Sequence, residues 1–418
     1  MSAERFSMIR KSLRPTIGSF LFLLAMTLAG VACVDTSKGL GVGGAMDAAA
    51  GGAMGSEPDA AAGNDDIDAE SGSAIDTGMR SISSMELVKD MGIGWNLGNT
   101  LDAVGGETAW GNPVTTQAMI QAIAASGFKS MRIPVTWRQH FGPAPGYSID
   151  PAWMDRVQQI VDWALGAGLY VIINMHHDGG GDISEGAWIR NASKDYDGVI
   201  AEYNALWAQI AARFRDHDDH LVLESMNEVG FDDLNVNGAP SQAAFDVLNK
   251  INADFVTLVR GSGGNNRQRH LLLAGYYTDI NNSVKGVVMP NDSRTILSIH
   301  YYTPSKFCIN GNPATWGNAA EVSTLLSQFA KLKTSFIDKG IPVILGEYGA
   351  VMTTEAASRI YWMEYVVKTS TDYGIASYLW DSGAGGEFDR GSLTWRTPGL
   401  LDALLRASSG AAYTPTKG

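Results

Sequence analysis

The segments Leu223-Glu-Ser-Met-Asn-Glu228 and Ile344-Leu-Gly-Glu-Tyr-Gly349 carry the pattern that decides the fold. In each segment an apolar run of strand length stops, and a glutamate, Glu228 or Glu347, stands where a glycine-containing loop begins. In α/β barrels, polar groups at the carboxyl ends of the strands meet on one rim. The two segments therefore predict two strands of a barrel with both carboxylates on its working face.

Strand-like and helix-like segments alternate along the rest of the chain, which is typical of parallel strands joined by crossover helices. We expect strands at 92–97, 130–134, 170–175, 221–225, 270–274, 295–300, 342–346 and 375–380. Helical patterns occur at 115–125, 151–165, 197–215, 242–259, 322–338, 355–371 and 399–406, whereas the return helix after the fifth strand is weak or missing. Eight such units, without a phosphate-binding Gly-x-Gly-x-x-Gly after the first strand, predict an α/β fold of the (β/α)8 TIM-barrel type, with one catalytic domain over residues 84–418.

Residues 1–33 have the features of an export signal. Positive charges at Arg10, Lys11 and Arg14 precede an apolar stretch at 20–29 that is short for a membrane span, and small residues follow. Cys33 directly after them resembles a bacterial lipoprotein cleavage site, so a lipid anchor on Cys33 and simple secretion both stay open. We expect a protein that is secreted or held on the outer surface.

Residues 34–80 consist almost entirely of small and acidic residues and contain no aromatic side chain. Such a segment cannot bury enough apolar surface to offset its chain entropy, so we expect a disordered linker. The second cysteine of the chain is Cys308, so no disulfide is expected within the mature domain. The formal net charge of −13 argues against nucleic acid as a partner, because phosphate binding needs clustered Lys and Arg. A neutral substrate and a monomeric protein are expected.

Polar or aromatic side chains stand at nearly every predicted strand end. They are Arg132, His176, His177, Asn227, Glu228, Tyr276, Tyr277, His300, Tyr302, Glu347 and Trp380. A structural role could explain any one of them, but so many at corresponding positions favour a site.

Two carboxyl groups on one pocket are what glycoside hydrolysis needs, one protonated to donate to the leaving oxygen and one ionised. We expect Arg132 and Tyr302 to keep Glu347 ionised, since positive charge and hydrogen bonds favour a carboxylate. Glu228, next to Asn227 and near His300, would hold the proton. A retaining enzyme would place the two carboxyl groups roughly 5–5.5 Å apart.

The same residues resemble those of glycoside hydrolase family 5, the cellulase-type endoglucanases. The stretches that carry the resemblance are Gly94-Trp-Asn-Leu-Gly-Asn-Thr-Leu-Asp102, Met131-Arg-Ile-Pro-Val-Thr-Trp137, Ile172-Ile-Asn-Met-His-His177, Met226-Asn-Glu228, Ile299-His-Tyr-Tyr302, Gly346-Glu-Tyr348 and Leu379-Trp380. One departure is Val229, where many members have proline.

The resemblance implies a retaining mechanism with Glu228 as general acid/base and Glu347 as nucleophile. It also implies that Arg132 orients Glu347, that His176 and Asn227 bind the reacting sugar with His300 and Tyr302, and that Trp380 stacks under that sugar. Because side chains alternate along a strand, only one of His176 and His177 should face the pocket, and the motif favours His176. Among the tryptophans, Trp137 and Trp188 are the predicted sugar platforms.

Two other kinds of protein must be weighed. A metal-dependent barrel hydrolase could use His176, His177, Asp178 and His300, but adjacent histidines on a strand point to opposite faces, so no metal or cofactor is expected. A sugar-binding protein without catalysis would not need both glutamates. The opening motif most resembles endo-β-1,4-glucanases, with an endo-β-mannanase or a xyloglucanase as the alternative.

Overall fold

The computed structural model of the protein describes residues 78–181, 183 and 186–418, all of which belong to one compact unit. The predicted export signal, including Cys33, and the predicted linker up to residue 77 lie outside the described residues. The expectations for both segments therefore stay predictions.

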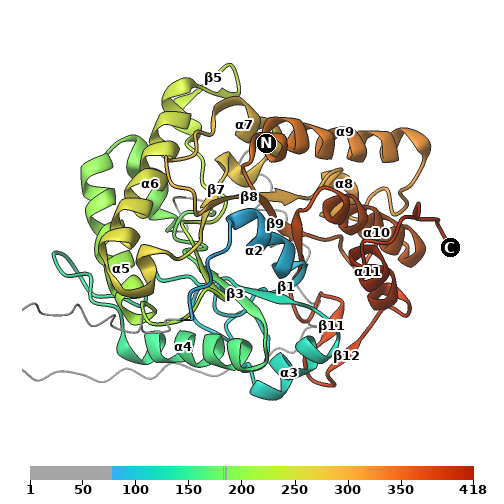
Figure 1. Ribbon diagram of the computed structural model, residues 1–418, viewed down its shortest axis with the longest axis horizontal. Helices are drawn as coiled ribbons and strands as arrows, with labels where there is room; N and C mark the ends of the chain where they lie inside the picture. Colours follow the sequence, from blue (N-terminus) through green and yellow to red (C-terminus); the bar gives the residue numbers. More distant parts are fainter. Residues whose placement is uncertain (1–77, 182, 184–185) are drawn as a thin grey trace, which may run out of the picture. The chain divides into compact units, whose positions relative to one another are not determined.

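Eight parallel strands close into a barrel, which confirms the predicted fold (Figure 1). In barrel order they follow the chain, and the last strand pairs with the first. The strands are β1 (Ile93–Leu97), β2 (Ser130–Ile133), β3 (Tyr170–Asn174), β4 (Leu221–Glu224), β7 (Leu271–Ala274), β8 (Thr295–Tyr301), β9 (Val343–Tyr348) and β10 (Ala376–Asp381). Two short hairpins, β5 (Asn235–Val236) with β6 (Ala239–Pro240) and β11 (Phe388–Asp389) with β12 (Thr394–Trp395), extend the loops after β4 and β10.

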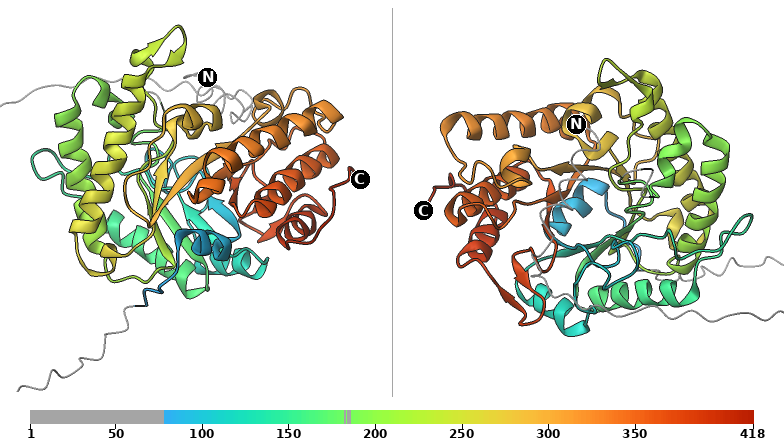
Figure 2. Two further views of the ribbon diagram at one scale, coloured as in Figure 1. Left: turned by 45° about the horizontal axis from the view of Figure 1, so that its top comes forward. Right: turned by 180° about the vertical axis from the view of Figure 1, so that it is seen from behind.

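Helices surround the barrel in the views of Figures 1 and 2. They are α3 (Gln117–Ala125), α4 (Pro151–Gly166), α5 (Tyr196–Arg213), α6 (Gln242–Gly261), α7 (Ile280–Gly286), α8 (Ser305–Cys308), α9 (Ala319–Ser335), α10 (Ala356–Asp372) and α11 (Leu400–Ser408). The return helix after the fifth barrel strand, predicted to be weak or missing, is the short α7. No helix within the described residues has the length and apolarity to cross a membrane.

One helix that the pattern of strand and helix segments misses, α2 (Ser84–Met91), covers one end of the barrel. A capping box starts it, because the Ser83 hydroxyl accepts from the Glu86 amide and the Glu86 carboxylate accepts from the Ser83 amide. Its buried side chains pack on apolar residues from the barrel interior, namely Tyr170, Ile172, Val222, Leu272, Ile296, Ile344, Ala376 and Tyr378. Apolar side chains therefore fill this end of the barrel.

The next layer of the interior is polar. Side chains alternate along each strand, so the positions two residues beyond the apolar layer also point inward. These buried residues are Asn96, Arg132, Asn174, Glu224 and Ser298. Since buried polar groups need partners, this layer has to form a connected network, and it lies directly beneath the strand ends.

Strand β9 contains a bulge that turns Glu347 toward the barrel. Ile299 of β8 pairs with Leu345, but the next residue, His300, pairs with Glu347, so Gly346 is an extra residue. A Cβ atom on Gly346 would lie 3.0 Å from His300 Nε2, closer than side chains normally approach. The strand was predicted to end at Gly346, but it continues through Tyr348, which pairs with Tyr301 of β8 and Leu379 of β10.

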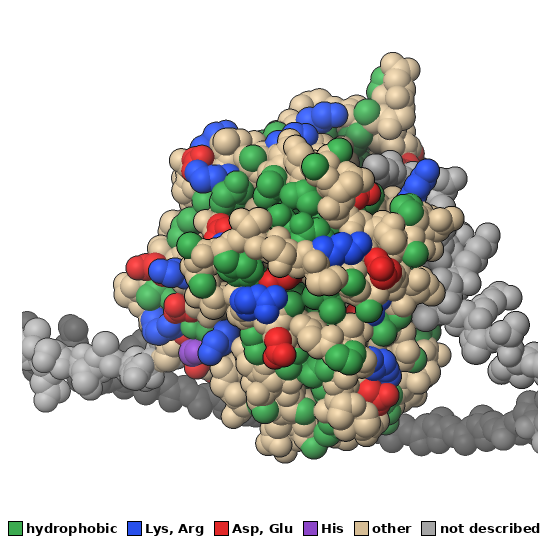
Figure 3. All heavy atoms as spheres, turned by 90° about the vertical axis from the view of Figure 1, so that its right-hand side faces the viewer, with side chains coloured by type: hydrophobic (Ala, Val, Ile, Leu, Met, Phe, Trp, Pro, Cys, Tyr) green, Lys and Arg blue, Asp and Glu red, His purple; other side chains and the backbone are tan. Residues whose placement is uncertain are grey.

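On the surface drawn in Figure 3, Lys and Arg side chains lie among Asp and Glu side chains. The described residues of that face thus lack the clustered positive charge that phosphate binding needs.

Candidate active site

Arg132 lies at the centre of the site and is completely buried. Its guanidinium donates to the carboxylates of Glu224 (2.7 Å) and Glu347 (2.9 Å) and to the amide oxygens of Asn96 (3.1 Å) and Asn227 (3.0 Å). Burial lowers the pKa of Arg132, but the two carboxylates more than offset this, so its pKa is raised. A permanent positive charge therefore stands beneath the strand ends.

Glu224 belongs to this network, although the pattern of strand-end residues does not reveal it. Its carboxylate accepts from the Ser298 hydroxyl (2.7 Å) and the Asn174 amide (3.0 Å) in addition to Arg132. The signal in the sequence is an acidic residue at an inward position of an otherwise apolar strand, because a buried carboxylate requires a cationic or hydrogen-bonding partner.

Glu347 is held by both of its carboxylate oxygens. One accepts from Arg132 and the other from the Tyr302 hydroxyl (2.9 Å), as predicted. Burial raises the pKa of Glu347, helped by the charge of Glu228, whereas His300, Arg132 and the Tyr302 hydroxyl oppose the shift. The predicted contacts are present, but burial outweighs them, so this carboxyl group is less acidic than an exposed one.

Glu228 lies near Glu347, and His300 approaches both carboxylates. Its Oε1 is 2.8 Å from His300 Nδ1, and that nitrogen is 3.6 Å from Oε2 of Glu347. One oxygen of each carboxylate and a ring nitrogen of His300 all lie within 4.8 Å of one another. The nearest carboxylate oxygens are therefore closer than the roughly 6.5–9.5 Å that separates the carboxyl groups of inverting enzymes, which favours retention.

Three further predicted residues lie around Glu347. Because Arg132 can only donate, it fixes the carbonyl oxygen of Asn227 and leaves the amide NH2 facing away from it. His176 is neutral, since burial lowers its pKa well below the usual value, and its Nε2 lies 3.9 Å from Glu347 Oε1. The half-buried ring of Trp380 stacks on His176, with ring centroids 5.6 Å apart and an angle of 11°.

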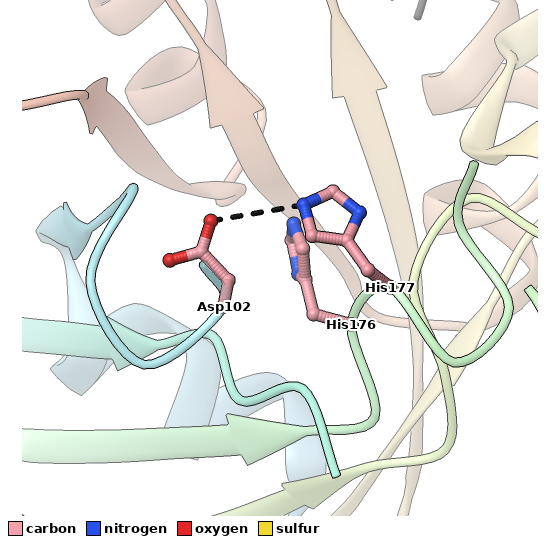
Figure 4. Close-up of side chains that lie close together, drawn as sticks. All are labelled: Asp102, His176 and His177. Atoms are coloured by element: carbon pink, nitrogen blue, oxygen red, sulfur yellow. Dashed lines mark ion pairs between the residues drawn. The ribbon is translucent and has the colours of Figure 1, made fainter. Parts of the chain in front are cut away.

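Of the two adjacent histidines, the favoured His176 is the one that lies beside Glu347, whereas His177 lies beside Asp102 and Gly180. Strand β3 ends at Asn174, so alternation no longer governs His176 and His177, whose ring centroids lie 4.7 Å apart. Both approach Asp102 in the loop after β1, and His177 Nε2 lies 3.8 Å from Asp102 Oδ2 (Figure 4). Burial raises the pKa of Asp102 to about 7.

The two tryptophans predicted to be sugar platforms, Trp137 and Trp188, differ in burial. Trp137 is fully buried and its indole N–H donates to the Asn174 carbonyl (2.9 Å), so it has no open face and cannot be a sugar platform. Trp188 is half-buried and donates to Asp178 (3.0 Å), so its proposed role stays a prediction. Trp110, also half-buried, packs its ring 5.5 Å from that of His177.

Two groups of side chains in the site have the spacing of metal ligands, namely Asp102, His176 and His177, and Glu228, His300 and Glu347. Two adjacent histidines therefore do not exclude a metal by geometry alone. At the group that contains Glu347, the Arg132 guanidinium lies 2.9 Å from the carboxylate and would repel a divalent cation.

Residues 96–386 match the family described as cellulase (glycosyl hydrolase family 5). Endoglucanase B of Clostridium cellulovorans is 39% identical over 364 residues, which cover 82% of this chain and 80% of that protein. A xyloglucan-specific endo-β-1,4-glucanase of Bacteroides ovatus is 38% identical, over 73% of this chain and 66% of its own. The solved structure of a broad-specificity endoglucanase from Ruminococcus champanellensis, with bound cellotriose, has a TM-score of 0.73 and 36% identity, covering 78% of this chain and 99% of that one. The family match over most of the chain agrees with the barrel and the paired glutamates. The chain therefore belongs to glycosyl hydrolase family 5, the cellulase family, and is a glycoside hydrolase.

Proposed function

We propose that this protein is a retaining endo-β-1,4-glucanase that cleaves internal bonds of cellulose or related β-glucans. The observation that carries the proposal is the short separation of the Glu228 and Glu347 carboxylates, one beside His300 and the other held by Arg132. The relatives named as endoglucanases support the choice of a β-1,4-glucan. One chain supplies every one of these residues, which fits a monomer.

The reaction takes two steps. First, a carboxylate oxygen of Glu347 attacks the anomeric carbon, the bond to the leaving oxygen breaks, and Glu228 gives its proton to that oxygen. Next, Glu228 takes a proton from water while the water oxygen attacks the same carbon, which releases the sugar from Glu347. A proton lies between Glu228 and His300 Nδ1 whichever of the two groups carries it.

The surrounding side chains fit the sugar that reacts. The Asn227 amide, turned away from Arg132, can donate to the 2-hydroxyl, a contact that strengthens in the transition state. The His176 Nε2–H points toward the same pocket, because Nδ1 accepts from the Asn174 amide. The indole of Trp380 offers an apolar face to the C–H groups of a sugar ring.

The alternative substrates are mannan and xyloglucan. The relative from Bacteroides ovatus is named as a xyloglucan-specific endo-β-1,4-glucanase, which keeps xyloglucan as a candidate substrate here. The predicted platform Trp188 and the half-buried Trp110 lie in the segments after β3 and β1, where such a choice would be made.

We also propose that the protein is exported and that Cys33 decides whether it stays on the membrane. Replacing Cys33 with Ser in the full chain should leave export intact and, where Cys33 is lipidated, should move activity from the membrane fraction to the medium. Retention of the unchanged chain in the cytoplasm would contradict the export proposal.

The proposed activity is tested by initial rates on soluble β-1,4-glucan, mixed-linkage glucan, xyloglucan and mannan. We expect the highest kcat/KM on a β-1,4-linked glucan and no effect of a chelator. Replacing Glu228 with Ala should lower kcat by about 10²- to 10⁴-fold, the usual contribution of general acid–base catalysis. Glu347→Ala should abolish reducing-end release, and unchanged release in both variants would contradict the assignment.

The pH dependence of kcat/KM should reveal the hydrogen bond from Tyr302. Glu347 must be ionised to attack, so activity falls as the pH drops through the pKa of Glu347. The Tyr302 hydroxyl lowers this pKa, so Tyr302→Phe should raise it and move the acidic limb of the profile to higher pH. The matched control is Tyr301→Phe, because the Tyr301 hydroxyl has no hydrogen-bond partner among the described residues. An acidic limb at the same pH in both variants would count against the role of this bond.

A further inference from the structure

The loop that follows Glu228, residues 229–232, is held at four consecutive positions by two other loops. From the loop after β7, the Tyr277 amide donates to the Val229 carbonyl (2.9 Å) and the Tyr276 hydroxyl accepts from the Phe231 amide (2.7 Å). From the loop after β3, Arg190 donates to the Gly230 carbonyl (2.9 Å) and to the Asp232 carboxylate (2.7 Å). The backbone directly after Glu228 is therefore fixed from two sides.

Arg190 joins all three loops through a single guanidinium. It comes from the 3-10 helix η2 (Trp188–Ser193), and its side chain is buried. Besides Gly230 and Asp232 it donates to the Tyr277 hydroxyl (2.8 Å) and to the Gly181 carbonyl (2.7 Å). Only the planar fork of an arginine can reach four acceptors in these directions, so lysine would not replace it.

Tyr277 adopts a backbone conformation that its residue type rarely tolerates. Its φ of 51° and the φ of 47° at Thr278 put two successive non-glycine residues in the left-handed region. Such strain persists where the surroundings impose it, and it is concentrated at functional sites. The Tyr277 ring also lies directly against Gly230, where a Cβ atom would be 2.2 Å from it.

The residue before Glu228, Asn227, is fixed as well. Its backbone N–H donates to the Met175 carbonyl (3.0 Å), and Arg132 donates to its side-chain oxygen. Glu228 thus stands between two anchored points, and a shift of residues 229–230 would move its carboxyl group relative to His300.

We propose that Arg190 and Tyr277 are positioning residues that fix the direction in which Glu228 delivers its proton. The proposal rests on the proposed function, in which Glu228 is the general acid. Proton transfer in a transition state needs the donor within hydrogen-bond reach of the leaving oxygen, so a small displacement slows it strongly. A purely structural role would instead lower stability and slow all substrates alike.

Aryl β-cellobiosides separate these two roles, because an acidic phenol leaves without help from a general acid and a weakly acidic phenol does not. The variants are Tyr277→Phe, which removes only the hydroxyl that accepts from Arg190, Arg190→Lys, and Gly230→Ala, whose methyl group would push against the Tyr277 ring. We expect kcat/KM for phenyl β-cellobioside to fall about 10- to 100-fold in Arg190→Lys and Gly230→Ala, less in Tyr277→Phe, and to stay within about twofold for the 2,4-dinitrophenyl substrate.

Ser193→Ala is the matched control. The Ser193 hydroxyl donates to the Asp233 carboxylate (2.8 Å) and to the backbone carbonyl of Arg190 (3.2 Å), so it joins the same two loops at their exposed edge but contacts neither the Arg190 guanidinium nor residues 229–230. It should not change the dependence on the leaving group. Thermal unfolding of each variant shows whether it is folded, and Tyr277→Phe keeps the ring in place should the other two fail to fold.

Equal losses on both substrates, or no loss on phenyl β-cellobioside in any folded variant, would overturn the proposal. Glu228→Ala provides the reference, because it should show the steepest dependence on the leaving group. Absence of that dependence in Glu228→Ala would overturn the proposed function itself, so failures of the two proposals are distinguishable.

Discussion

The buried charge of Arg132 is the constraint on which the site depends. A guanidinium in the middle of a barrel is tolerated only with full hydrogen bonding, and the removal of one partner of a buried ion pair costs roughly 3–5 kcal/mol. Here two carboxylates pair with the guanidinium, Glu224 from the polar layer of the barrel interior and Glu347 from the strand ends. Glu224, locked by Ser298 and Asn174, keeps Arg132 in place whether or not Glu347 is ionised. Glu347 can therefore change its charge or become glycosylated without leaving the guanidinium unpaired.

The layers of the barrel interior place the charge of Arg132 directly beneath the strand ends. Apolar side chains capped by α2 fill one end, the polar layer around Arg132 follows, and the two glutamates lie at the strand ends. The bulge at Gly346 turns Glu347 inward, opposite His300. A strand with regular alternation would have pointed Glu347 toward the surrounding helices, so one extra residue in β9 decides where Glu347 faces.

Strand order and strand-end residues could be predicted because they follow from local pattern and from the rule that parallel strands end on one rim. What a pattern of single residues does not contain is contact. The burial of Trp137, the joint approach of His176 and His177 to Asp102, and the membership of Glu224 depend on where β2, β3 and β4 end and which neighbours they meet. The role of Arg190 could not be predicted for the same reason. Nothing in its own segment shows that three of its four acceptors, Gly230, Asp232 and Tyr277, lie 40 to 87 residues farther along the chain.

The site thus has two anchored carboxylates with different supports, an ion pair for Glu347 and a fixed loop for Glu228. The central claim is that Glu347 forms the covalent bond to the sugar. In a 2-fluoro-substituted β-cellobioside with a dinitrophenyl leaving group, the fluorine slows both steps and the leaving group speeds only the formation of the glycosyl-enzyme. The glycosyl-enzyme therefore accumulates and can be digested and analysed by mass spectrometry. The account predicts a single labelled peptide that carries the sugar on Glu347. A label on Glu228 or on any other residue would contradict it.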